Sequence, residues 1–316
     1  MIQPYILLAI FLLLSSLAIM IWACDVAINN AVILGKRFGI SDLFMGIFII
    51  AIGTSLPEFA ATVQAMHIEA PGIVAGNLVG SNIANILLVG GVMLLPLNSY
   101  KIEDKNKVSL HFFLLISFIF SLALFININL SYFTIPIIII LLGIFLYLEL
   151  RKKSEKKEEY KEESEKYKNN LLIIIAIIFS FIILYFSSGY FISYAKAISS
   201  HFGISDTIVG VSIVALGTSL PEVITTMIAL YKKKSNLALG NIIGSCVANI
   251  TIITLIAIIL GDTINFYELL NNFNKALFIL TALIFYGSVI GKFTNRMTGI
   301  VYILIYSVYI LTQYTI

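Results

Sequence analysis

Apolar runs of similar length recur along the whole chain, and short polar stretches separate them. A run of about 17–25 apolar residues is long enough for a helix to cross the hydrocarbon core of a bilayer. The pattern predicts an all-α polytopic membrane protein with ten transmembrane helices. These predicted spans lie near residues 4–24, 42–66, 72–96, 110–127, 132–149, 170–195, 206–230, 236–261, 275–291 and 298–315.

One long polar segment interrupts this pattern. Arg151–Lys168 holds eight basic and six acidic residues and no aliphatic residue, so it is expected to stay solvated. It leaves five predicted spans on either side. We therefore predict a first five-helix repeat at 1–150, a charged linker at 151–169 and a second five-helix repeat at 170–316.

Composition and charge narrow the functional class. Of the 316 residues, 59% are hydrophobic and the mean hydropathy is +1.00, whereas soluble domains contain roughly 45–50% apolar residues. A net charge of +3 gives no indication of nucleic-acid binding, and the two cysteines lie in apolar surroundings that do not suggest a disulfide framework. The sequence offers neither a nucleophile–base pair nor a cofactor-binding loop. An enzyme is therefore the least favoured class, and no cofactor is expected.

The distribution of basic residues predicts the orientation in the membrane. If the N-terminus is outside, all Lys and Arg except Lys196 and Lys275 fall in the inner loops. Such an excess of positive charge is typical of the cytoplasmic side. We therefore expect a multi-pass protein of the cell membrane, with both termini outside and the linker at 151–169 in the cytoplasm.

The chain contains an internal repeat. Residues 38–90 align without a gap on residues 202–254 at a constant offset of 164, and 23 of the 53 positions are identical. The stretch Gly-Thr-Ser-Leu-Pro-Glu occurs at 53–58 and again at 217–222. Because five spans is an odd number, the second half must enter the membrane from the opposite side. Inverted repeats of this kind place a substrate near the middle of the bilayer.

Each copy of this six-residue stretch ends in a carboxylate inside an apolar span, Glu58 or Glu222. An ionisable residue within a membrane segment is costly and indicates a functional site. Pro57 removes the amide donor that the carbonyl of Gly53 would use, so it opens the helix, and Pro221 does the same in the second copy. Freed carbonyls are tolerated only where they face protein or a water-filled cavity. A bound cation would satisfy them.

A second repeated pattern, Gly-Asn-x-x-Gly-Ser-x-x-Ala-Asn, adds polar side chains at a helical spacing of four. The two copies contribute Asn77, Ser81 and Asn85 and Asn241, Ser245 and Asn249. The small residues beside them form a stripe that lets another backbone approach closely. For Asn77 and Asn241, a ligand role and a helix-bridging role are both open. Since the groups are all oxygen-bearing and neither His nor Cys forms a stripe among them, the set favours Ca²⁺ or Na⁺ over softer metals.

Charge restricts the mechanism further. Glu58 and Glu222 supply two negative charges, which one Ca²⁺, two Na⁺ or protons can neutralise. An empty site with both groups ionised would be unstable in the membrane, which favours obligatory exchange over return of an empty carrier. A Na⁺/Ca²⁺ antiporter is the first hypothesis. A proton-coupled antiporter of Ca²⁺ or another divalent cation is the second, and a cation channel with a duplicated pore is the third.

At these residues the chain resembles the calcium:cation antiporter superfamily, in its sodium/calcium exchanger branch, and the short linker resembles a minimal prokaryotic-type member. The resemblance covers all ten predicted spans and is most specific in the alpha-repeats at 38–90 and 202–254. It implies sodium coupling and alternating access, in which spans one and six slide over a core of the other eight. The expected partners are the lipid bilayer, Ca²⁺ and Na⁺, and we expect the protein to work as a monomer.

The resemblance also assigns the candidate site residues. It implies a calcium site at Glu58 and Glu222 with the backbone carbonyls of Thr54 and Thr218. The sodium sites that it implies share the two glutamates and comprise Ala51, Ser55, Ser81, Ala215, Thr218, Ser219 and Ser245. Asn85 and Asn249 are expected to line the centre of the same site. Some family members have Asp at the position of Asn249, so this chain lacks a third carboxylate there.

Overall fold

The computed structural model describes residues 4–37, 51–98, 102, 104–126, 130–150, 169–231, 233, 235–261 and 263–315. The first residues of predicted span two, the start of the repeat at 38–90 and most of the linker at 151–169 lie outside these ranges. Within them the chain is helical, as predicted, apart from two strands of two residues each. Strands β1 (Leu130–Ser131) and β2 (Thr263–Ile264) pair antiparallel, a contact that the hydropathy pattern did not predict.

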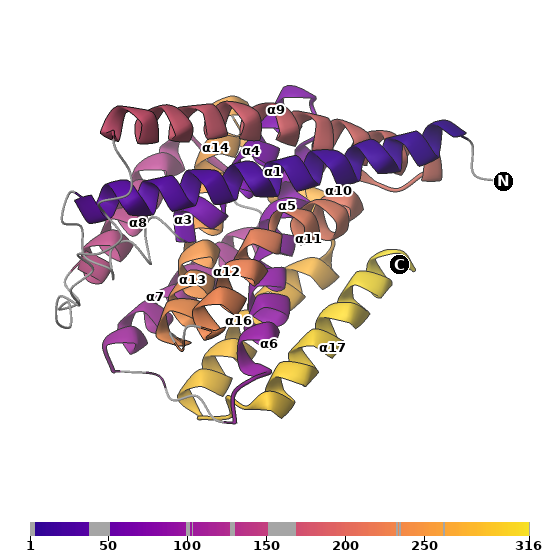
Figure 1. The fold of residues 1–316 in the computed structure, drawn as a ribbon. Helices are drawn as coiled ribbons and strands as arrows, with labels where there is room; N and C mark the ends of the chain where they lie inside the picture. The colour runs from indigo at the N-terminus through magenta and orange to yellow at the C-terminus, as the bar shows by residue number, and fades with distance from the viewer. Residues whose placement is uncertain are drawn as a thin grey trace.

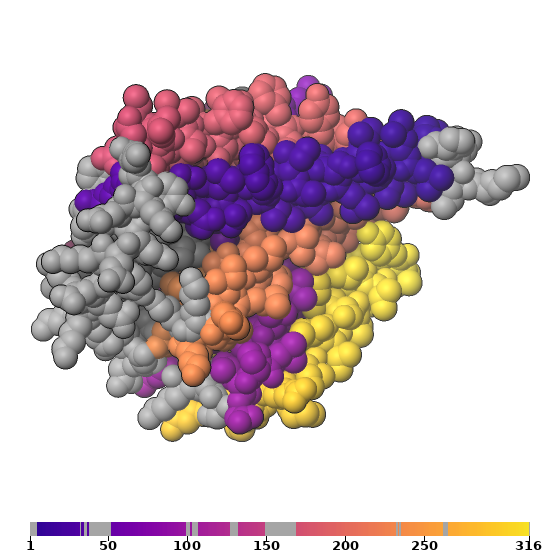
Figure 2. All heavy atoms as spheres, viewed as in Figure 1, coloured from indigo at the N-terminus to yellow at the C-terminus, as the bar shows by residue number. Residues whose placement is uncertain are grey.

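Two long helices, α1 (Pro4–Arg37) and α9 (Asn170–Phe202), lie side by side across one side of the molecule (Figure 1). They run antiparallel, since Tyr5 near the start of α1 contacts His201 near the end of α9 with 2.5 Å between Oη and Nδ1. Figure 2 shows α1 as a rod on the surface, and large apolar side chains such as Phe11 are exposed along it. Such a surface suits contact with lipid.

The predicted bounds of these two helices, 4–24 and 170–195, were too short. The helices contain 34 and 33 residues, or about 50 Å at roughly 1.5 Å per residue, more than the hydrocarbon thickness of about 30 Å. Hydropathy marks only the part of a helix that sits in hydrocarbon. Helix α9 continues beyond that part between two capped ends: Asn169 accepts from the amide of Leu171, and Gly203 ends the helix with φ of 67°.

The interior is built from the segments that carry the repeat. Helix α5 is part of the membrane-length helix Pro71–Leu94. This is the most enclosed of the membrane-length helices in the described residues, and 94% of its apolar stretch is buried. In the first half these segments are α3 (Ala51–Thr54), α4 (Leu56–His67), α5 (Pro71–Ala84), the π-helix η2 (Asn85–Val89) and α6 (Gly90–Leu94). In the second half they are α10 (Asp206–Val209), the π-helix η5 (Gly210–Val214), α11 (Ala215–Thr218), α12 (Leu220–Tyr231), α13 (Ser235–Ala248), the π-helix η6 (Asn249–Ile253) and α14 (Thr254–Gly261).

The other helices surround this interior. They are α7 (Asp104–Phe125), the short 3-10 helix η3 (Tyr132–Thr134), α8 (Ile135–Leu150), α15 (Phe266–Leu269), α16 (Asn272–Ile290) and α17 (Arg296–Gln313). Within the described residues, seven helices are long and apolar enough to cross a membrane, and the apolar helix at Tyr132–Leu148 is shorter. The chain is therefore an all-helical, multi-pass membrane protein. The full count of ten spans stays a prediction.

The small residues of α5 allow a very close helix contact. A Cβ added to Gly76 would lie 2.4 Å from the carbonyl oxygen of Thr207 and 2.7 Å from the amide nitrogen of Val211. A Cβ added to Gly80 would lie 2.7 Å from the Cα of Val211. Backbone atoms cannot move aside as side chains can. The predicted close approach of another backbone to this stripe is thus confirmed for α5, and its partner is the segment from α10 to η5.

This contact predicts the effect of two matched substitutions. Gly76→Ala should lower the free energy of unfolding by about 1–3 kcal/mol or more, because the new methyl group overlaps backbone atoms of a neighbouring helix. Gly143→Ala in α8 should be neutral or stabilise by up to about 1 kcal/mol, since its Cβ would meet nothing within 4 Å. Thermal unfolding in detergent measures both. Equal melting temperatures for the two variants would contradict the close contact.

Candidate functional site: a buried cage of oxygen atoms

Both copies of the Gly-Thr-Ser-Leu-Pro-Glu stretch break their helix at the same residue. Helix α3 ends before Ser55, whose φ and ψ are −83° and 4°, and α11 ends before Ser219, at −84° and 4°. Each break precedes a proline, as predicted from the missing amide donor. The carbonyl oxygen of Gly53, which lost that donor, accepts a hydrogen bond from the Cys24 thiol at 3.1 Å. This role of Cys24 was not predicted from the sequence.

The two breaks bring the two halves of the chain together. Ser219 Oγ donates to Glu58 Oε1 at 3.1 Å, and Ser55 Oγ donates to Glu222 Oε1 at 3.1 Å. Each carboxylate therefore reaches the broken turn of the other half. The four residues are fully buried. Residues more than 160 positions apart thus form one reciprocal polar cluster.

Each carboxylate keeps one oxygen without a protein partner. Glu58 Oε2 and Glu222 Oε2 are buried and accept no hydrogen bond from the described residues. Serine hydroxyl groups from both halves donate hydrogen bonds to the two carboxylates. A buried carboxylate without full compensation is costly. The pair is therefore suited to receive a cation between the two halves.

Asn77 and Asn241 are tied to the protein by their side-chain amides. Asn77 Nδ2 donates to the carbonyl of Glu58 at 3.2 Å and to Thr62 Oγ1 at 3.3 Å, and Asn241 bonds Glu222 and Thr226 at 3.3 Å each. These bonds fasten α5 to α4 and α13 to α12. The helix-bridging role that the sequence left open is thus present, and a ligand role stays a prediction.

Thr62 and Thr226 were missed by the sequence reasoning. Both are fully buried, and Thr62 Oγ1 also donates to the Glu58 carbonyl at 2.8 Å. A signal was available, because the two threonines are identical at the repeat offset of 164 and each follows a glutamate by four residues. Each threonine hydroxyl accepts a hydrogen bond from the side-chain amide of Asn77 or Asn241, and the same amide donates to the backbone carbonyl of Glu58 or Glu222.

Asn85 and Asn249 differ from the other asparagines of the repeats. Both are fully buried, and the nitrogen and oxygen atoms of their side chains have no partner within the described residues. Each begins a π-helix, η2 or η6. A π-helical turn inside an α-helix is common at functional sites. The side-chain amides of Asn85 and Asn249 are therefore suited to line a site for a polar ligand or an ion.

The remaining candidates lie around the same cluster, with small differences between the halves. Ser245 Oγ donates to Glu222 Oε1 at 3.4 Å, whereas its counterpart Ser81 donates to Asn77 Oδ1 at 3.0 Å. Thr54 Oγ1 donates to Asn241 Oδ1 at 3.2 Å.

Thr218 and the two alanines complete the set. Thr218 Oγ1 turns back to the carbonyl of Val214 at 2.9 Å, and the carbonyl of Ala215 accepts from the amide of Ser219 at 3.1 Å. Ala51 begins α3. Every candidate residue therefore lies on α3, α5, α11, α13, at the breaks beside them or at the first turn of α4, α12, η2 and η6.

The donor set is two carboxylates among neutral oxygen groups. In the described residues, no group of three or more His, Cys, Asp and Glu side chains that could hold a metal ion comes together. Hydroxyl, amide and carboxylate oxygens suit hard cations such as Ca²⁺.

Comparisons with known proteins agree with this chemistry. A family model described as sodium/calcium exchanger protein matches residues 8–151 and again residues 172–315. The two matches are separated by 164 positions, the offset of the internal repeat. Sodium/calcium exchanger MaX1 of Methanosarcina acetivorans is 30% identical over 298 residues, with 77% of this chain and 80% of the relative covered. An uncharacterized membrane protein of Methanocaldococcus jannaschii is 31% identical over 69% of this chain and 70% of its own length.

Solved structures of the sodium-calcium exchanger NCX_Mj have the same fold. One of them, soaked with 2.5 mM Na⁺ and 10 mM Sr²⁺, aligns with a TM-score of 0.69 and 26% identity over 97% of this chain and 99% of that chain. Another, soaked without Na⁺ and Ca²⁺, aligns with a TM-score of 0.66. The likeness therefore covers nearly the whole of both chains.

The reciprocal cluster predicts the outcome of removing either charge. Glu58→Gln and Glu222→Gln should each weaken Ca²⁺ binding by about 30-fold or more, because the remaining carboxylate cannot neutralise a divalent cation in a buried site. Isothermal titration calorimetry in detergent measures the dissociation constant. Glu69→Gln, at an exposed position beyond α4, is the control and should bind like the original protein. Unchanged affinity in Glu222→Gln would contradict the site.

Proposed function

The chain belongs to the sodium/calcium exchanger protein family, and from this premise we propose that it exchanges Na⁺ for Ca²⁺ across the cell membrane. The observation that carries the proposal is the reciprocal pairing of Ser55 with Glu222 and of Ser219 with Glu58. Each pair leaves one buried carboxylate oxygen without a partner among the described residues. A secondary transporter needs such a site, built jointly by two halves that can move relative to each other.

The proposed ligands follow from the cluster. Glu58, Glu222 and the carbonyls of Thr54 and Thr218 would hold Ca²⁺, with Asn85 and Asn249 lining the centre. The proposed sodium ligands, in addition to the glutamates, are Ala51, Ser55, Ser81, Ala215, Thr218, Ser219 and Ser245. Because Ca²⁺ and Na⁺ share the two carboxylates, occupancy by one ion excludes full occupancy by the other. That competition couples the two fluxes.

The proposed topology places this site between two inverted repeats of five spans each, at 1–150 and 170–316. The matching breaks at Ser55 and Ser219 and the π-helices that begin at Asn85 and Asn249 support it. We place both termini outside and the linker at 151–169 in the cytoplasm, on the distribution of Lys and Arg. The functional unit in this proposal is the monomer.

The proposed movement is a sliding of α1 and α9 over the inner helices. The two helices contact each other along their length, and polar contacts join both ends of the pair: Tyr5 with His201, and Arg37 with Asn170. They are thus built to move as one body. Large apolar side chains of both helices are exposed on the side that faces away from the interior. In this proposal that side contacts lipid, which can rearrange as the two helices slide.

Flux measurements separate this proposal from the proton-coupled alternative. In proteoliposomes, uptake of ⁴⁵Ca²⁺ should require an outward Na⁺ gradient and should not respond to a pH gradient or a K⁺ gradient imposed alone. The physical reason is that two Na⁺ can replace one Ca²⁺ at the two carboxylates without loss of charge balance. Glu58→Gln serves as the inactive control. Uptake driven by the pH gradient in the absence of Na⁺ would support proton coupling instead.

A further inference from the structure

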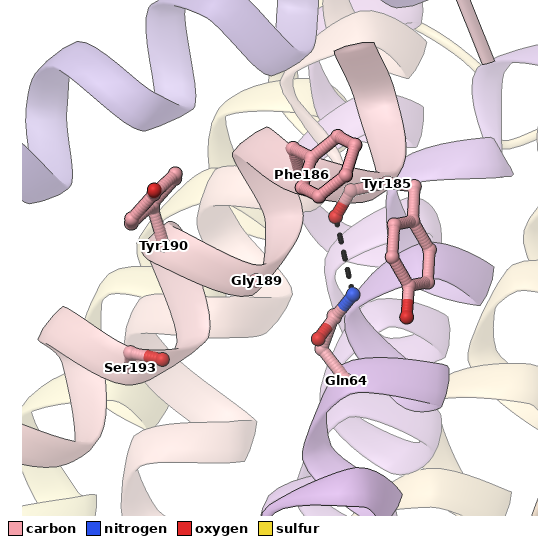
Figure 3. Close-up of a pocket in the computed structure, with 6 residues that line it drawn as sticks. All are labelled: Gln64, Tyr185, Phe186, Gly189, Tyr190 and Ser193. Carbon is pink, nitrogen blue, oxygen red and sulfur yellow. Dashed lines mark hydrogen bonds between the residues drawn. The ribbon is translucent and has the colours of Figure 1, made fainter. Parts of the chain in front are cut away.

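The contact between α9 and α4 includes a side-chain bond to a helix backbone. Gln64 in α4 donates from Nε2 to the carbonyl oxygen of Tyr185 in the middle of α9 at 3.2 Å (Figure 3). The two residues border a cavity of about 310 Å³ that opens to the outside of the molecule and that Phe186, Gly189 and Tyr190 also line. The bond thus lies at the edge of the contact between the two helices.

Gly189 makes this bond geometrically feasible. In a helix, the side chain of a residue covers the turn before it, so the residue four positions after Tyr185 shields the Tyr185 carbonyl from neighbouring helices. Gly189 occupies that position and has no side chain. A Cβ placed there would lie 3.1 Å from Cδ and 3.1 Å from Oε1 of Gln64. The glycine thus forms a notch in α9 that receives the Gln64 amide.

A second polar contact fixes the same pair of helices. Lys196 Nζ on α9 donates to the carbonyl oxygen of Ile68 at the end of α4 at 3.2 Å, and it lies 3.9 Å from a carboxylate oxygen of Asp206. Lys196 is separated from Tyr185 by eleven residues, or about 16 Å along the helix axis. Two bonds at this separation define one register of α9 against α4.

The bond at the notch exists in only one half of the molecule. At the repeat offset of 164, Gln64 corresponds to Ile228 and Gly189 corresponds to Asp25. Isoleucine cannot donate a hydrogen bond, so the second half cannot make the same contact. A bond that is present on one side of a pseudosymmetric transporter favours one of its two end states over the other.

We propose that Gln64 is a positioning residue that, seated in the Gly189 notch, holds α9 in the register of this structure and so biases the transport cycle toward that state. The proposal rests on the proposed sliding of α1 and α9. When α9 slides along its axis, the Tyr185 carbonyl leaves the amide, and Gln64 must find another partner. Gln64 binds neither ion; it acts through the position of α9.

A double-mutant cycle with a distance readout tests this proposal. Spin labels are attached at Ser200 near the end of α9 and at Thr315 after α17, both exposed positions, while the native Cys24 and Cys246 are fully buried. Pulsed electron paramagnetic resonance then reports the share of molecules in each register. Gln64→Ala should reduce the share in the present register relative to the other by roughly two- to tenfold, the effect of one lost hydrogen bond.

Gly189→Ala should give a similar shift, because its methyl group displaces the Gln64 amide. In the Gln64→Ala background it should add no further shift, since no amide remains to displace. Ser193 also lines the cavity and takes no part in the bond, so Ser193→Ala is the control. An unchanged distance distribution in both single variants, or equal effects of Gly189→Ala in the two backgrounds, would overturn the proposal.

The same variants distinguish a failure of the proposed role of Gln64 from a failure of the proposed function. Distances between spin labels do not depend on which ions the protein carries. A protein that shows no Na⁺-dependent Ca²⁺ flux would refute the proposed exchange while leaving the register measurable. A protein that exchanges the ions but shows no shift in register would refute the role of Gln64 alone.

Discussion

Two carboxylates buried in the same place are the constraint on which the rest of this structure depends. Glu58 and Glu222 are fully enclosed, each accepts a hydrogen bond from a serine of the other half, and each keeps one oxygen without a partner among the described residues. In a medium of low polarity, such a pair is tolerable only when a cation or protons offset the charge. The proposed ion site follows from this need of the two buried carboxylates for a counter-ion.

Three features of the surrounding helices position the two carboxylates. Prolines break the helices, so that serine hydroxyls at the breaks face the carboxylate of the opposite half. The amides of Asn77 and Asn241 then hold the carbonyls of the two glutamates. Glycines of α5 let the interior helices approach to backbone contact.

The two halves are similar without being identical, and the differences carry information. Ser245 bonds a carboxylate while Ser81 bonds an amide. The exchange of ions between two sides requires two states of comparable energy, and a symmetric protein would make them equal. Departures from symmetry are therefore where the balance between the states is set. Contacts between the long outer helices and the core are the natural place for such departures, since the proposed sliding would change them.

Much of the proposed site was predictable because its polar residues interrupt apolar spans and do so at matching positions in both repeats. Polar and charged residues inside apolar spans are rare, and their repetition at a constant offset leaves little room for chance. The broken helices followed from Pro57 and Pro221 for a purely local reason, the loss of an amide donor. The membrane class, the repeat and the identity of the cluster residues are all properties of short stretches, which is why one sequence sufficed for them.

Other features required the tertiary structure. The full length of α1 and α9, the bond of Cys24 to the Gly53 carbonyl, the threonines at 62 and 226 and the seat of Gln64 on α9 were not predicted. Hydropathy measures preference for hydrocarbon and says nothing of where a capped helix ends in water. Contacts between residues more than a hundred positions apart depend on how helices pack across the two halves. The sequence by itself determined which groups would be costly to bury; only the packing of the two halves decided which partners would satisfy them.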